Sequence, residues 1–184
     1  MPHCIVKVGG SLFDWPALGP VLREYLAGLP FERILVVPGG GASADAVRAL
    51  DAVHGLGEAV AHEIALTSLL VSNHFLRALL EIDSEPRSDW WIASGRLHVV
   101  PPAMILKRYE AKHGTVPNTW QFTSDSLAAC AAMVAGCRLI MLKSTDEAAA
   151  DLVDPCFASF PVKRVEFVNL RRGDGLGCSP RFGA

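Results

Sequence analysis

Short apolar runs alternate with stretches of helical periodicity along the N-terminal part of the chain. Residues 4–8 and 33–37 are nearly continuous runs of aliphatic residues, the pattern of strands buried on both faces of a parallel sheet. The residues that follow each run carry apolar side chains every three or four positions, the spacing of one helix face. Strand, glycine turn and helix thus occur twice in succession. This order predicts a layered α/β fold with a parallel, right-handed sheet.

The rest of the pattern extends the same fold. We expect Asp14 to cap the first helix, with Pro16 in its first turn. Thr123 and Ser124 are expected to cap a helix of small residues that ends before Gly136. The further elements predicted are a helix over 44–53, a long helix over 58–81, a short helix ending at Lys112, and strands over 90–93, 97–100, 138–143 and 165–170.

The length of the chain, 184 residues, suits one substantial core and is too short for two comfortable domains. The sequence shows neither internal repeats nor a linker, so we expect residues 1–170 to form a single domain. Glycine and proline are prominent in residues 171–184, which we expect to form a mobile tail.

Composition and charge narrow the class of protein. Hydrophobic residues make up 51% of the chain and charged residues 20%, an apolar surplus that indicates a large core or a subunit interface. A net charge of −2 gives no electrostatic signature of nucleic-acid or anionic-membrane binding. No apolar stretch is long enough to span a bilayer, no signal segment opens the chain, and the five cysteines are scattered without CxxC spacing. We therefore expect a cytoplasmic protein with reduced thiols and neither a nucleic-acid nor a membrane partner.

Two glycine-rich turns follow the first two predicted strands. Gly9 and Gly10 end the first strand, just after Lys7, and residues 39–41 end the second. The carboxyl ends of neighbouring parallel strands form the edge where ligands of open α/β sheets bind. Glycine lets backbone N–H groups approach an anion closely, and a helix N-terminus adds partial positive charge. A glycine pair can also make a tight turn with no ligand, but two such turns beside a lysine favour a phosphate site.

Several other motifs are absent or incomplete. The chain has no GxxxxGK followed by Ser or Thr, which excludes a P-loop NTPase. It also lacks GxSxG, the nucleophile motif of α/β-hydrolases. His62 and Glu63 are followed by Leu66 where a zinc-protease helix needs a second histidine. Residues 39–44 match the dinucleotide-binding pattern GxGxxA, but that fold requires a strand after the helix, and a second helix is predicted here.

Two polar segments are expected at the same edge of the sheet. Asp125 lies in the first turn of a predicted helix, where an aspartate ordinarily complements the helix dipole. Lys143 ends a predicted strand and precedes the polar residues 144–146, and a lysine at a strand end is ordinarily solvated. Taken separately, neither segment distinguishes a functional residue from a structural one.

In combination, four segments resemble the amino acid kinase family. They are VKVGGSL at 6–12, VVPGGG at 36–41, TSDSLAA at 123–129 and LKSTD at 142–146. The resemblance implies a three-layer α/β/α sandwich with a mainly parallel sheet, here with a shortened C-terminal nucleotide lobe. It also implies ATP-dependent phosphoryl transfer to a carboxylate, carbamate or phosphate acceptor. Trp120 and residues 152–155 resemble the branch of the family that serves methanofuran biosynthesis, which implies that the acceptor is phosphorylated.

The resemblance further implies roles for individual residues. Lys7 matches the lysine that stabilises the transferring phosphoryl group, and Asp125 matches the aspartate that organises the lysines of the site. The residues expected to bind ATP, used with Mg²⁺, are Gly9, Gly10, Ser11, Lys143, Ser144, Thr145 and Asp146. The residues expected to bind the acceptor are Gly39, Gly40, Gly41, His62 and Ser124.

The chain also departs from the family pattern. Better-known family members carry a second catalytic lysine on a helix after the nucleotide loop. The only later lysine here, Lys163, lies in residues 160–164, which are predicted to enter a strand, so it does not match that role. Lys143 is a candidate replacement by position alone. Ala42 stands where the family often has asparagine, and residues 146–165 are too few for a full adenine-binding subdomain. A non-catalytic nucleotide- or oxyanion-binding protein on the same fold is therefore the alternative.

The predicted helix over 58–81 has two further features. Its apolar residues cover more than one face, which favours a homodimer over a monomer, although a helix buried on all sides would show the same pattern. His62, near its N-terminal end, is placed to meet an acceptor phosphate together with the amides of Gly40 and Gly41. The alternative for His62 is a partly buried histidine with a backbone partner.

Overall fold

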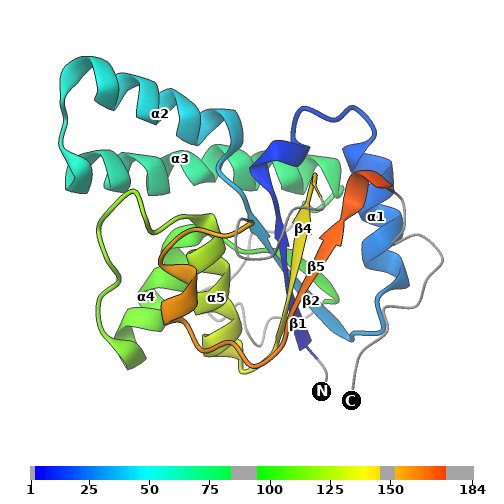
Figure 1. Ribbon diagram of the computed structural model, residues 1–184. Helices are drawn as coiled ribbons and strands as arrows, with labels where there is room; N and C mark the ends of the chain where they lie inside the picture. Colours follow the sequence, from blue (N-terminus) through cyan, green and yellow to red (C-terminus); the bar gives the residue numbers. More distant parts are fainter. Residues whose placement is uncertain (1–2, 84–94, 146–151, 173–184) are drawn as a thin grey trace.

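A computed structural model describes residues 3–83, 95–145 and 152–172 (Figure 1). Within these residues, five strands form one sheet in the order β3-β2-β1-β4-β5, and every pair of neighbours is parallel. The central strand, β1, therefore has β2 on one side and β4 on the other. The strands are β1 (His3–Val8), β2 (Arg33–Pro38), β3 (Leu97–Val99), β4 (Arg138–Lys143) and β5 (Val165–Asn169).

Helices cover both faces of this sheet (Figure 1). α1 lies on one face, α4 and α5 lie on the other, and α2 and α3 form a hairpin that extends sideways beyond one end of the sheet. The predicted three-layer α/β/α architecture is confirmed. The helices are α1 (Leu18–Gly28), α2 (Gly41–His54), α3 (Glu58–Leu79), α4 (Pro102–His113) and α5 (Ser124–Ala135), with short 3-10 helices η1 (Gly10–Leu12), η2 (Phe157–Ser159) and η3 (Leu170–Arg172).

Alternation along the strands divides the interior into two cores. Val6 and Val8 of β1 belong to the cluster that includes the α1 residues, whereas Ile5 belongs to the cluster that includes the α5 residues. Because side chains alternate between faces, Lys7 shares the α5 face with Ile5. Lys143 shares that face with Met141 of β4 for the same reason. The two lysines at the ends of neighbouring strands therefore project toward the start of the same helix.

Within the described residues, the predicted elements agree with the structure except at the starts of α1 and α2; α2 begins at Gly41, three residues before the predicted start. α1 begins at Leu18 with Ala17 as its N-cap, so the prediction that Asp14 caps it is wrong. The chain forms η1 directly after the glycine turn, and the Asp14 carboxylate instead accepts a hydrogen bond from Arg171. The strand predicted over 90–93 lies outside the described residues. α5 has the predicted boundaries, with Thr123 at its N-cap and Gly136 in the left-handed conformation at its C-cap.

Two observations concern membrane-spanning helices and the state of the cysteines. In the three described ranges, no helix combines the length and apolar character needed to cross a bilayer. The cysteines in those ranges, Cys4, Cys130, Cys137 and Cys156, are free thiols.

Candidate active site

The two glycine turns lie directly against each other at the carboxyl edge of the sheet. The Gly9 N–H donates to the Leu142 carbonyl (2.9 Å), and the Gly39 N–H donates to the Val8 carbonyl (2.8 Å). A Cβ atom added at Gly10 would lie 2.2 Å from the Gly41 nitrogen. No side chain fits at that distance, so glycine here is required for backbone contact between the turns.

The N–H groups of Gly9 and Gly39 are thus held by the sheet. The helices that follow the two turns begin without a side-chain cap. α2 begins at Gly41, and neither its N-cap, Gly40, nor any acidic side chain in its first turn caps it. η1 begins at Gly10, and it also has neither a side-chain cap at its N-cap, Gly9, nor an acidic residue in its first turn. The first N–H groups of a helix have no intrahelical acceptor and carry partial positive charge, which suits an anion.

Two lysines share one carboxylate at this edge. The ammonium group of Lys7 lies 2.5 Å from one Asp125 oxygen. The ammonium group of Lys143 lies 3.1 Å from the same oxygen and 3.0 Å from the other. All three residues are buried, with Lys7 4%, Asp125 7% and Lys143 9% exposed. The structure therefore joins three predicted site residues, from β1, α5 and β4, in one ion-pair network.

The two lysines control the protonation state of Asp125. Burial alone would raise the pKa of Asp125, but the charges and hydrogen bonds of Lys7 and Lys143 outweigh it and hold this pKa below its ordinary value. Burial and the charge of Lys7 lower the pKa of Lys143, and Asp125 opposes that shift. Asp125 is consequently ionised at neutral pH and orients cations; it is not available as a proton acceptor.

Residues around Lys143 complete this side of the site. The Lys143 ammonium group also donates to the Leu152 carbonyl. The Ser144 hydroxyl donates to the Ser11 hydroxyl (2.8 Å), which links the end of β4 to the first glycine turn. Thr145 is exposed at the surface beside them. Asp146, predicted with the same group, lies outside the described residues.

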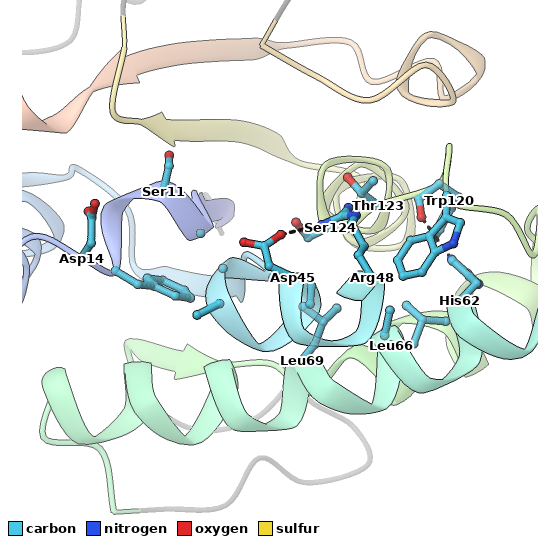
Figure 2. A pocket seen from close by; sticks show the side chains of 18 residues that line it. Ser11, Asp14, Asp45, Arg48, His62, Leu66, Leu69, Trp120, Thr123 and Ser124 are labelled. Atoms are coloured by element: carbon cyan, nitrogen blue, oxygen red, sulfur yellow. Dashed lines mark hydrogen bonds and ion pairs between the residues drawn. The ribbon is translucent and has the colours of Figure 1, made fainter. Parts of the chain in front are cut away.

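A cavity of about 580 Å³ opens between the two turns, the α2–α3 hairpin and the start of α5. Figure 2 shows it running along α2, with Ser11 and Asp14 near one end and Trp120 and His62 at the other. Four of the five predicted acceptor residues line it; Gly39 is not among its lining residues. The predicted residues that line it are Gly10, Ser11, Gly40, Gly41, His62 and Ser124.

His62 lies in the cavity wall with both ring nitrogens engaged. Its Nε2 donates to the Phe122 carbonyl (3.1 Å), because a carbonyl oxygen only accepts, and its Nδ1 lies 2.5 Å from the Asn118 side-chain oxygen. His62 as a whole is 2% exposed. These contacts match the alternative of a buried histidine with a backbone partner, and they fasten the segment before α5 to α3.

Trp120 fastens the same segment to the tip of the α2–α3 hairpin. Its indole N–H donates to Asp51 (3.0 Å), its backbone N–H donates to Glu58 (3.0 Å), and the Arg48 guanidinium lies 5.0 Å from the ring centre. In the sequence Trp120 stood out only as part of the family resemblance. Arg48 had no signal there, because a charged residue on the polar face of a helix is unremarkable.

The charges at this edge suit phosphate better than a directly coordinated metal ion. In the part of the chain that the structure describes, no group of three or more His, Cys, Asp or Glu side chains is placed to hold a metal ion. Both oxygens of Asp125 are occupied by lysines. Ammonium groups and uncapped helix N–H groups are donors to phosphate oxygens. Mg²⁺ commonly binds nucleotide sites through substrate phosphates with few protein ligands, so this donor set is compatible with a magnesium–nucleotide complex.

Comparison with known proteins agrees with this chemistry. No family model matches the chain. Over 181 residues it is 27% identical to the (5-(aminomethyl)furan-3-yl)methyl phosphate kinase of Methanocaldococcus jannaschii, which covers 94% of this chain and 76% of the relative. The chain is similar to a phosphate kinase. This distant similarity extends over most of the chain.

Proposed function

We propose that the protein is an ATP-dependent kinase that transfers the γ-phosphoryl group to a small acceptor which itself carries a phosphate. The observation that carries this proposal is the Lys7–Asp125–Lys143 network beside two glycine turns with uncapped helix N–H groups. Phosphoryl transfer demands little covalent chemistry from a protein and depends on positioning and on positive charge around the transferring oxygens.

Each lysine has a distinct part in this proposal. An ammonium group has three N–H donors. Lys7 directs one of them to Asp125, and two are left for the transferring phosphoryl oxygens. Lys143 takes the place of the family's second catalytic lysine, since Asp125 holds it beside Lys7. The acceptor phosphate is already deprotonated near neutral pH, so no base is needed. Its oxygen forms the new O–P bond as the bond from the γ-phosphorus to the β-phosphate oxygen breaks and ADP leaves.

In this scheme the nucleotide lies at the first glycine turn and the end of β4, and the acceptor lies against the second glycine turn. Gly10, Ser11, Lys143 and residues 144–146 would hold the ATP phosphates, and Mg²⁺ bound to those phosphates would supply further charge neutralisation. The Gly9 N–H donates to the Leu142 carbonyl and shapes the turn instead. The acceptor lies in the cavity, with its phosphate at the amides of Gly40 and Gly41 and near Ser124. The cavity volume is within the range of small-molecule sites. An aminomethylfuran methyl phosphate, named in the similar kinase, is the first acceptor to test.

The proposal includes a homodimer formed through the α2–α3 hairpin. Leu69 and Leu76 of α3 are buried in the single chain, but Val71 on the same helix is 64% exposed, so α3 is not buried on all sides. Large apolar residues exposed along the hairpin are Leu50, Val53, Val60, Ile64, Leu70, Val71 and Phe75. Light scattering of the wild type and of Val71→Arg tests this point; a dimer mass for the first and a monomer mass for the second are expected.

The decisive experiment is an acceptor panel of phosphomonoesters, carboxylates and alcohols with ATP and Mg²⁺, read by phosphorus NMR. A diphosphate product formed by the wild type and not by Lys7→Ala is expected. Transfer only to carboxylates or alcohols would contradict the phosphorylated acceptor. ATP binding by calorimetry without turnover on any acceptor would indicate the non-catalytic nucleotide-binding alternative.

A further inference from the structure

The carboxylate of Asp154 is seated on the N-terminus of α5. It accepts hydrogen bonds from the backbone N–H groups of Thr123 (3.1 Å) and Ser126 (2.9 Å). It also accepts from the Thr123 hydroxyl (2.7 Å) and from the Ser126 hydroxyl. Asp154 is 8% exposed and Ser126 is fully buried. A side chain distant in sequence thus satisfies N–H groups that the helix itself leaves without acceptors.

The residue between these anchor points is the one that pairs with both lysines. Asp125 lies in the same helical turn, one position before Ser126. The segment that carries Asp154 also provides the Leu152 carbonyl, which accepts a hydrogen bond from Lys143. One short segment therefore contacts both the helix turn that holds Asp125 and a lysine that Asp125 pairs with.

We propose that Asp154 is a positioning residue for phosphoryl transfer: it fixes the first turn of α5 so that Asp125 holds Lys7 and Lys143 at the ends of their strands. This inference rests on the proposed kinase function. A free first turn would let Asp125 move relative to both ammonium groups, and a displacement of about 1 Å in such a site costs on the order of 10²-fold in rate.

Charge gives Asp154 a second, separable effect on the same lysine. The groups that face Lys143 are Lys7 from β1, Asp125 from α5 and Asp154 from the segment after β4. The two carboxylates raise the pKa of Lys143 against burial and the charge of Lys7, which lower it. Removing the Asp154 charge should therefore make Lys143 lose its proton at a lower pH.

The test compares Asp154→Asn with Gly136→Ala in the full chain. Asparagine keeps the size of the side chain but brings an NH₂ group to donors that need an acceptor. Gly136 lies at the other end of α5 at φ 63°, with no atom within 4 Å of an added Cβ, so Gly136→Ala strains the same helix away from the site. We expect Asp154→Asn to lower kcat by roughly 10-fold or more with KM values nearly unchanged, and the alkaline limb of kcat to move to lower pH. Gly136→Ala should change neither.

An unchanged kcat in Asp154→Asn overturns the inference, and so does an equal fall of kcat in Gly136→Ala. If Asp154→Asn does not fold, Ser126→Ala removes one anchor and keeps the charge; it should lower kcat, and an unchanged kcat overturns the inference. Failure of the kinase function itself appears differently, as no turnover in the wild type. In that case the lysine titration, followed by NMR of ε-¹³C-labelled lysine, decides: a Lys143 resonance that titrates at the same pH in Asp154→Asn and wild type overturns the inference.

Discussion

α2 and α5 begin at the same edge of the sheet, yet only the N-terminus of α5 is capped by side chains. At α2 the N-cap is Gly40, no side chain caps the helix, and the first turn lines the cavity. At α5 the side chains of Thr123 and Asp154 occupy the N–H groups. The positive end of α2 is thus open to a ligand, whereas that of α5 is used internally to hold Asp125. The difference shows that a helix N-terminus at the ligand edge is not by itself a ligand site.

The largest effect is expected at the charge that the α5 end holds in place. Lys7→Ala removes an ammonium group oriented by Asp125, and loss of one preorganised donor costs roughly 10²-fold or more in kcat. Steady-state kinetics with the best acceptor measure this, and circular dichroism confirms the fold. Turnover at the wild-type rate in a folded variant would show that Lys7 has no part in the reaction.

The second prediction concerns the open end of α2. Gly41 has φ 54°, and an added Cβ would lie 2.7 Å from the Phe13 ring. Gly55, at the other end of α2, has φ 60° with no atom within 4 Å. We expect Gly41→Ala to cost about 2 kcal/mol of unfolding free energy and Gly55→Ala about 1 kcal/mol, measured by urea denaturation.

Comparing Gly41→Ala with Gly55→Ala also distinguishes an effect on stability from an effect on ligand binding. Only Gly41→Ala should raise KM for the acceptor, because Gly41 lines the cavity and Gly55 does not. Equal KM values in the two variants would contradict the view that the α2 end is the open anion site.

A third prediction uses pH to examine the α5 side. The folded-state pKa of Asp125 lies below its ordinary value of 3.8, so the unfolded chain binds the proton more readily. The stability that Asp125 contributes is therefore complete well above pH 4. It is lost as the pH falls below this value and through the lower pKa of the folded state. In Asp125→Asn the free energy of unfolding should fall less steeply with acid than in the wild type. Parallel curves would contradict the ionised state assigned to Asp125.

The smallest effect is expected at the local cap of α5. Thr123→Ala removes the hydroxyl that accepts from the Asp125 N–H (3.4 Å) and donates to Asp154 (2.7 Å). Loss of such a cap costs about 1 kcal/mol, which corresponds to a Tm lower by about 2–4 °C. Thr123→Ser retains the hydroxyl and should keep the wild-type Tm in calorimetry.

What sequence could predict differs between the two helices for a physical reason. The boundaries of α5 were predictable because Thr123 and Gly136 act on their immediate neighbours. The cap by Asp154 was not, since it joins residues 28 positions apart that only the folded chain brings together. The strands were predictable as buried apolar runs. Asp14 was assigned wrongly because a 3-10 turn follows the glycines and delays α1.

His62 illustrates the same limit at the cavity. Its place near the start of α3 is evident from periodicity, but its partners Asn118 and Phe122 come from a segment without regular pattern. The meeting of Lys7, Asp125 and Lys143 was suggested by the family resemblance; spacing alone gives three unrelated residues. Tertiary contacts between irregular segments are therefore the part of the site that sequence reasoning left open.

The strand order has a consequence for how the protein is made. Among the five strands described, β1 is synthesised first, but it pairs with β4. One edge of this central strand is therefore uncovered until Arg138, the partner of Cys4, has been synthesised. At ordinary rates of translation this delay is on the order of ten seconds. During that time an apolar strand edge is exposed to other nascent chains. The site needs residues from both strands, so it forms only after Lys143 has been synthesised.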